Sequence, residues 1–157
     1  KEKRYRAVAG LSMGGYGSFL FAIKHPELFA HCAPLSAAFF EETAFVTGPQ
    51  SNYDRAFAIL YGKGLTGKDR VNETYKLNDP YRIVSDTANT RKLKTVKYYI
   101  DCGDDDFLSP GNAAMHKLLK EKGIAHEFRM RDGAHTWTYW RHSIRDVLRV
   151  ITDSFHQ

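Results

Sequence analysis

Short apolar runs alternate with amphipathic segments along the chain. Strand character appears in four stretches, at residues 5–11, 30–37, 95–102 and 126–131. The first three are mostly apolar, as expected of strands buried on both faces. In residues 126–131, Phe128 and Met130 alternate with charged side chains (Glu127, Arg129 and Arg131), which is typical of a half-exposed strand near a sheet edge.

Helical segments separate these strands. The first, residues 14–24, ends at His25-Pro26 because the residue before a proline leaves helical space. The second is expected to begin with Ser109 as cap and Pro110 in its first turn, and to stop at Gly123. The alternation of strands and helices predicts an α/β fold with a parallel sheet.

The last helix, about residues 137–155, has a pronounced apolar stripe. The stripe consists of Trp140, Ile144, Val147, Leu148, Ile151 and Phe155. Arg141, Arg145 and Arg149 lie on the opposite face, which we interpret as a solvated surface.

Residues 38–94 do not fit the alternation. They are rich in Gly, Asn, Pro and aromatic residues, and a structureless loop of that length is uncommon inside a compact domain. We therefore expect a cap-like insertion with one or two short helices, lying over a pocket.

Composition sets further bounds. The chain has 157 residues, 43% of them apolar and 26% charged, which suits one globular domain. Its net charge of +5 is concentrated in the first few residues, so the remainder is only mildly basic and nucleic-acid binding is not expected. No apolar run approaches the roughly 18 residues of a membrane span, so no membrane partner is expected either.

The sequence offers little for a metal or a disulfide framework. Cys32 and Cys102 each lie in a predicted strand and are interpreted as buried structural thiols. Neither H-E-x-x-H nor paired C-x-x-C motifs occur, so we expect no metal and no cofactor.

The sharpest local signal is the segment Gly10-Leu11-Ser12-Met13-Gly14, which has the form G-x-S-x-G. It lies between a predicted strand and a predicted helix, the context in which this motif presents a nucleophilic serine on a strained turn. Ser12 is therefore the candidate nucleophile. The backbone N–H of Met13 would point to where a carbonyl oxygen gains charge.

Two other interpretations of this glycine-rich segment are weaker. A phosphate-binding loop would need G-K-[ST] or G-x-G-x-x-G, and neither follows. A turn in which small residues merely pack helix on strand remains the structural alternative.

A serine nucleophile needs a base, and the base needs an orienting carboxylate. His135 lies in a loop between the alternating strand and the last helix, whereas the other histidines lie within or beside predicted elements. The acid is expected after the third strand, where Asp104, Asp105 and Asp106 are adjacent. They do not have the spacing of a calcium loop and could form a solvated turn; periodicity does not select the inward-facing one.

Three segments together resemble the esterase family of the α/β-hydrolases that includes feruloyl, acetyl-xylan and tributyrin esterases. Residues 6–17 resemble its nucleophile segment, 101–108 its acid segment and 133–140 the segment holding the base. The resemblance assigns the acid to Asp106, with Asp105 as the second choice.

This resemblance implies a three-layer α/β-hydrolase fold with a mostly parallel sheet. In that fold the nucleophile strand lies near the middle of the sheet, yet here it begins near residue 5. We therefore expect residues 1–157 to form the C-terminal portion of a catalytic domain that lacks its N-terminal strands. One flank of the nucleophile strand would then pair in a homo-oligomer or with the missing N-terminal half.

The implied activity is that of a serine carboxylesterase acting on short acyl or hydroxycinnamoyl esters, such as acetyl or feruloyl groups on plant polysaccharide. Tyr16, Trp137 and cap aromatics such as Phe39 are candidates for substrate binding, with core packing as the alternative. The partner would be a small-molecule or saccharide ester. The resemblance favours a secreted or periplasmic location, with a cytoplasmic one as the alternative.

Two other functions stay open at this point. An acyltransferase of the same fold would differ only in which acceptor reaches the acyl-enzyme. A non-catalytic fragment or interaction module would retain the motif without a competent site.

Overall fold

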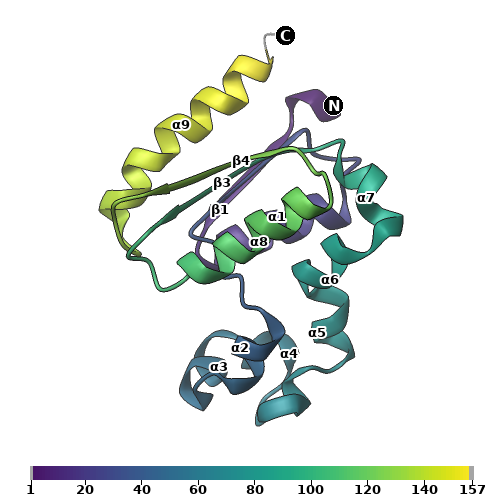
Figure 1. Ribbon diagram of the computed structural model, residues 1–157, viewed down its shortest axis with the longest axis vertical. Coiled ribbons are helices and arrows are strands. Elements are labelled where there is room, and N and C mark those ends of the chain that lie inside the picture. Colours follow the sequence, from purple (N-terminus) through teal and green to yellow (C-terminus); the bar gives the residue numbers. More distant parts are fainter. Residues whose placement is uncertain (1, 156–157) are drawn as a thin grey trace.

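The computed structural model describes residues 2–155, which form a parallel four-stranded sheet with helices on both faces (Figure 1). The strands lie side by side in chain order and comprise β1 (Ala7–Leu11), β2 (His31–Leu35), β3 (Lys97–Gly103) and β4 (His126–Arg131). Every neighbouring pair is parallel. The predicted α/β class and the edge position of residues 126–131 are confirmed.

Helices cover the two faces of the sheet and complete three layers (Figure 1). On one face α1 (Met13–Lys24) and α8 (Ser109–Glu121) pack over the strands. Their core contains the fully buried side chains of Phe19, Ile100, Met115 and Leu119.

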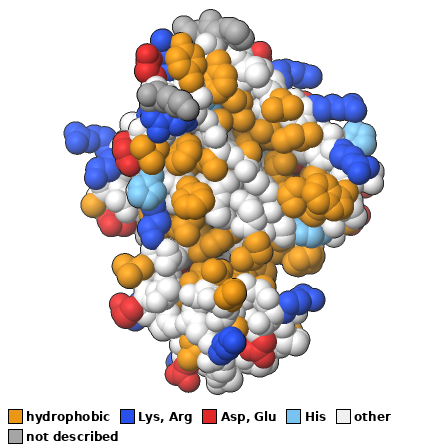
Figure 2. All heavy atoms as spheres, turned by 180° about the vertical axis from the view of Figure 1, so that it is seen from behind, with side chains coloured by type: hydrophobic (Ala, Val, Ile, Leu, Met, Phe, Trp, Pro, Cys, Tyr) orange, Lys and Arg blue, Asp and Glu red, His pale blue; other side chains and the backbone are white. Residues whose placement is uncertain are grey.

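The other face is covered by α9 (Trp137–Phe155), which contacts β2 and β3. Trp140 and Val147 pack there against Leu35 and Tyr99. The predicted stripe of α9 is only partly buried, because Ile144 and Leu148 are 37% and 55% exposed. Figure 2 shows the molecule from behind relative to Figure 1, and on that side groups of apolar side chains reach the surface between charged ones.

Residues 38–94 contain more helix than the one or two short helices expected. They form α2 (Glu42–Thr47), α3 (Gln50–Ala56), α4 (Ala58–Tyr61), α5 (Glu73–Asn78), α6 (Pro80–Ser85), α7 (Thr87–Leu93) and a 3-10 turn at Gly67–Arg70. Several polar residues in this stretch cap the N-termini of helices and do not belong to long loops. The side chains of Asn72, Asp79 and Asp86 each accept a hydrogen bond from a backbone N–H in the first turn of a new helix.

This stretch divides into two structural parts. Helices α2 to α5 share an aromatic cluster of Phe45, Tyr53, Phe57, Tyr61 and Tyr75, and extend from one end of the sheet (Figure 1). By contrast, α6 packs against α1 and α8, and Val84 and Leu93 belong to the main core. That residues 38–94 act as one cap stays a prediction.

The ends of α8 differ slightly from expectation. Leu108 occupies the cap position and Ser109 is already helical, with no side-chain cap, so the predicted capping role of Ser109 is wrong. Its hydroxyl instead donates to the carbonyl of Asp104. Gly123 follows the helix with φ of 61°, as predicted for a glycine stop.

Two further expectations concern cysteines and membranes. Cys32 and Cys102 are buried free thiols, as predicted. Within residues 2–155, no helix has both the length and the apolar character needed to cross a bilayer.

Candidate active site

The parallel sheet brings three loops to one edge. The carboxyl ends of β1, β3 and β4 lie at that edge, since neighbouring strands run in the same direction. Ser12 follows β1, Asp106 follows β3 and His135 follows β4.

Ser12 has the strained backbone expected of an elbow between strand and helix. Its φ of 56° and ψ of −121° lie outside the regions that serine ordinarily adopts. The surrounding chain fixes this conformation, because Ser12 N–H donates to the Leu35 carbonyl at 2.9 Å and the Ser12 carbonyl accepts from Ala38 N–H at 3.1 Å. Gly10 is also required, since a Cβ there would lie 2.2 Å from the Gly14 carbonyl oxygen.

His135 bridges the serine and the carboxylate. Its Nε2 lies 2.9 Å from Ser12 Oγ, and its Nδ1 lies 2.8 Å from Asp106 Oδ2. When Nδ1–H donates to the carboxylate, Nε2 of the neutral ring accepts the hydrogen bond of the Ser12 hydroxyl. This is the tautomer that a general base needs.

Of the three adjacent carboxylates, Asp106 is the one that contacts His135. Its side chain is fully buried, and Oδ1 accepts a hydrogen bond from Leu108 N–H at 2.9 Å while Oδ2 meets His135. Asp105, the second choice by resemblance, is exposed.

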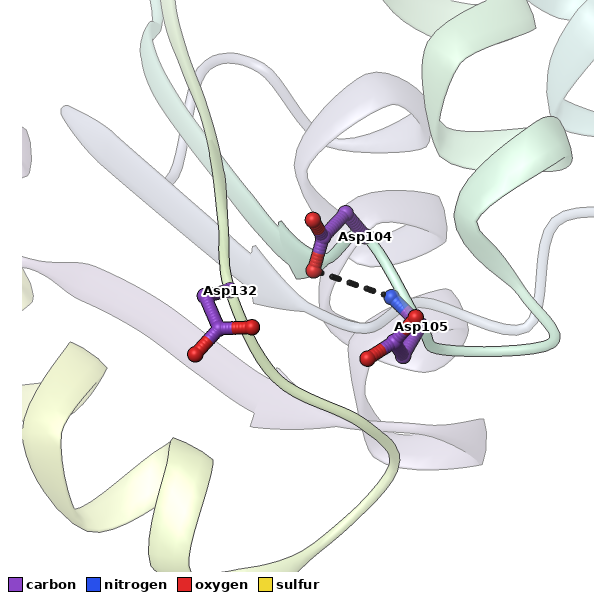
Figure 3. A group of neighbouring side chains, drawn as sticks. All are labelled: Asp104, Asp105 and Asp132. Carbon is purple, nitrogen blue, oxygen red and sulfur yellow. Dashed lines mark hydrogen bonds between the residues drawn. The ribbon is translucent and has the colours of Figure 1, made fainter.

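Asp104 and Asp105 instead belong to an exposed group with Asp132 (Figure 3). Asp104 Oδ1 accepts hydrogen bonds from the backbone N–H groups of Asp105 and Gly133, both at 3.0 Å. The bond from Gly133 joins the loop after β3 to the loop after β4. Asp104 thus helps to hold together the two loops that carry Asp106 and His135.

Aromatic rings flank the imidazole. The ring of Phe107 lies 4.8 Å from that of His135, and the ring of Trp140 lies 4.7 Å away and nearly perpendicular. Trp140 is in turn fixed by its indole N–H, which donates to Ser36 Oγ at 3.0 Å. Sequence analysis did not identify Phe107, although its position directly after Asp106 was a usable signal.

Met13 is the first residue of α1, so its N–H has no carbonyl acceptor one turn earlier in the helix. The N–H lies beside Ser12 at the positive end of the helix dipole. The predicted oxyanion donor is therefore placed at the site, with its oxyanion role still a prediction.

A cavity of about 350 Å³ opens beside Ser12. Its wall is mainly apolar and is contributed by Met13, Leu108 and residues of α2 and α3, including Phe45 and Tyr53. A chamber of this size and character suits the apolar part of a small ester.

The structure does not bring the predicted substrate-binding residues to this cavity. The Tyr16 hydroxyl points away into a buried contact with Tyr61 Oη and the Asn78 carbonyl, both at 2.8 Å. Trp137 is 63% exposed and packs edge-on against Trp140. Phe39, the other aromatic candidate, is a core residue, whereas its neighbour Phe40 lines the cavity.

The remaining histidines lie away from this site. His116 and His126 bond to each other at 2.8 Å between α8 and β4, and His31 is buried in β2. His25 and His142 lie on the surface, and His156 lies outside the described residues.

Comparison with known proteins identifies the family of the chain. The family described as "Putative esterase" matches residues 1–151. A curated acetyl esterase of Caldicellulosiruptor saccharolyticus is 28% identical over 153 residues, which are 97% of this chain and 55% of that protein.

Solved structures of two hydrolases are similar to the chain in sequence and in fold. A ferulic acid esterase is 29% identical with a TM-score of 0.78, over 98% of this chain and 53% of that one. The fluorophosphonate-binding serine hydrolase F of Staphylococcus aureus is 27% identical with a TM-score of 0.70, over 99% of this chain and 56% of that one. The chain thus spans about half the length of the relatives it matches. With a parallel sheet and three layers in common with these structures, the chain belongs to the esterase family of the α/β-hydrolase fold.

Proposed function

We propose that the protein is a serine carboxylesterase that works through Ser12, His135 and Asp106. The observation that carries this proposal is the continuous pair of hydrogen bonds from Ser12 Oγ through His135 to the buried Asp106 carboxylate. The ester-hydrolysing relatives support the same reaction class.

The reaction proceeds in two steps. Ser12 Oγ attacks the ester carbonyl carbon while His135 Nε2 takes the hydroxyl proton, and the same proton is given to the departing alcohol oxygen. Water then attacks the acyl-enzyme, with His135 again as base, and Ser12 regains its proton as the acid leaves. Asp106 orients the imidazole and stabilises its protonated form, and Met13 N–H donates to the oxyanion in both steps.

The substrates we propose are short acyl or hydroxycinnamoyl esters, including acetyl and feruloyl groups on plant polysaccharide. The apolar cavity of about 350 Å³ beside Ser12 accommodates either acyl group. The relatives named acetyl esterase and ferulic acid esterase favour the same two classes.

The decisive experiment is Ser12→Ala in the complete protein, assayed with 4-nitrophenyl acetate and with a fluorophosphonate probe. We expect turnover to fall by a factor on the order of 10⁶ and labelling to disappear. The matched control is Ser85→Ala, which removes an exposed hydroxyl on α6 and should retain both. Turnover near the parent rate in the Ser12 variant would refute the nucleophile assignment, and a parent protein that neither turns over nor reacts with the probe would indicate an inert module.

A further inference from the structure

The charged residues that line the cavity beside Ser12 are all positive. Two arginines, Arg55 and Arg70, line it, and among the described residues of its wall there is no aspartate or glutamate. An otherwise apolar chamber of about 350 Å³ thus carries net positive charge.

Arg70 is the more buried of the two cations, with only 3% of its surface exposed. Nη1 donates to the carbonyl oxygens of Phe45 at 2.9 Å, Val46 at 3.3 Å and Gly48 at 2.9 Å, and Nη2 donates to Gln50 Oε1 at 2.6 Å. All of these acceptors are uncharged. The guanidinium therefore caps the C-terminal end of α2, and none of these acceptors neutralises its charge.

Part of the hydrogen-bonding capacity of Arg70 is unused. Its Nε is buried and has no hydrogen-bond partner in the part of the chain that the structure describes. The guanidinium carbon also lies 4.8 Å from the centroid of the Tyr53 ring. A buried cation whose acceptors are all neutral and a buried N–H without an acceptor both oppose folding, so such groups often have a ligand or a function.

Arg55 adds to the same field from α3. Its side chain is exposed, and its Nη2 lies 3.5 Å from Asn52 Oδ1, a weak contact with a neutral group. Solvent screens the charge of the exposed Arg55 more than that of the buried Arg70, so Arg70 makes the larger contribution to the potential in the cavity.

We propose that this cavity selects esters that carry a carboxylate on the group bound inside it, with Arg70 as the main specificity-determining residue and Arg55 as a second. The inference rests on the proposed function and adds a substrate class to it. The anion could be attached to the acyl part or to the alcohol part of the ester, and both place a carboxylate beside the guanidinium groups.

The test compares charged and neutral esters of similar shape in the complete protein. One arm uses mono-4-nitrophenyl adipate against 4-nitrophenyl hexanoate, with the carboxylate on the acyl part. The other uses 4-acetoxybenzoate against its methyl ester, with the carboxylate on the alcohol part. We expect the parent to favour the anion in one arm, and Arg70→Gln to lower the ratio of kcat/KM values in that arm about tenfold, as expected for a lost charge-assisted hydrogen bond.

Controls separate a charge effect from damage to the cavity wall. Arg141→Gln removes one exposed positive charge from α9 and should retain the ratio. If Arg70→Gln fails to fold, Arg55→Gln decides, because the Arg55 side chain is exposed and its contact with Asn52 is weak. We expect a smaller fall in the same ratio.

The possible results are distinguishable. The inference is overturned if the protein hydrolyses the neutral esters but neither variant changes the ratio of kcat/KM values for charged and neutral esters in either arm. That result leaves the proposed function intact. Absence of turnover with all four esters in the folded parent overturns the proposed function, and with it the inference.

Discussion

Arg131, at the end of β4, forms an ion pair with Asp101 on the neighbouring β3, with 2.7 Å between Nη1 and Oδ2. The Asp101 carboxylate is fully buried and also accepts hydrogen bonds from the Tyr139 and Ser143 hydroxyl groups of α9. Arg131 also forms an ion pair with Asp146 of α9, with 2.7 Å between Nη2 and Oδ2. One buried carboxylate thus joins β3, β4 and α9 just before the loops that carry Asp106 and His135.

Removal of the cation from this network should destabilise the fold. We expect Arg131→Met to lower the free energy of unfolding by roughly 3 kcal/mol, because it leaves the buried Asp101 without its counter-charge. Urea denaturation measures the change. Arg129→Met on the same strand is the matched control, since Arg129 pairs with Glu127 at the surface and such pairs contribute about 1 kcal/mol or less. Equal losses in the two variants would contradict a special role for Asp101.

The two glycines that flank the Ser12 elbow should respond differently to alanine. A Cβ at Gly10 would lie 2.2 Å from the Gly14 carbonyl oxygen, whereas a Cβ at Gly14 would meet nothing within 4 Å. Gly10→Ala is therefore expected to lower Tm by several degrees. Gly14→Ala, within α1, should keep or raise Tm, because alanine favours a helix by about 0.5–1 kcal/mol over glycine. A thermal melt of both variants in which Gly14→Ala is the more damaging would show that the elbow is not packed as described.

The orienting carboxylate can be tested against its neighbour. Asp106→Asn should reduce kcat for 4-nitrophenyl acetate by a factor on the order of 10⁴, because an amide in its place no longer selects the productive His135 tautomer. Asp105→Asn changes an exposed side chain and should stay within a few-fold of the parent. The assignment to Asp106 fails if the larger loss occurs in the Asp105 variant.

Both cysteines should resist alkylation in the folded protein. Burial raises the pKa of Cys102 to about 12, with a further contribution from the Asp106 charge, and burial also raises the pKa of Cys32. Iodoacetamide at about pH 8.5 should therefore modify neither thiol until denaturant is added, as mass spectrometry would reveal. Rapid modification of native protein would contradict their burial.

The raised pKa values of the two thiols also determine in which direction pH changes the stability of the fold. A thiol with a raised pKa keeps its proton in the folded chain at a pH where the unfolded chain has lost it, so stability falls as pH rises above the ordinary thiol pKa of 9. Several buried tyrosines, including Tyr75, have raised pKa values and act in the same direction.

Much of the site could be predicted because the chemistry is encoded locally. The G-x-S-x-G segment, the strand that precedes it and the order of serine, acid and histidine are enough to predict that Ser12 and His135 lie at one sheet edge. Asp106 needed the family resemblance, because hydrophobic periodicity does not distinguish three adjacent carboxylates in a loop. The location of the protein stays a prediction.

The failures concern contacts between distant segments. The alternation of residues 126–131 groups Arg131 with the exposed Glu127 and Arg129, yet Asp146 from the middle of α9 binds its guanidinium. Tyr16 is a candidate for the pocket with core packing as the alternative, and its hydroxyl meets Tyr61, which comes from the segment with the weakest sequence pattern. Local periodicity carries no information on such pairings.

Helices α2 to α5 carry their own aromatic cluster and extend from the sheet rather than packing across it (Figure 1). The wall of the chamber can therefore be rebuilt by substitutions that do not disturb the strands carrying Ser12, Asp106 and His135. Under the proposed function, substitutions in this wall would change the preference for the acyl group while Ser12, Asp106 and His135 keep their positions. Divergence within this architecture is expected to concentrate in residues 40–75, and swapping that stretch between homologues should exchange their preferences.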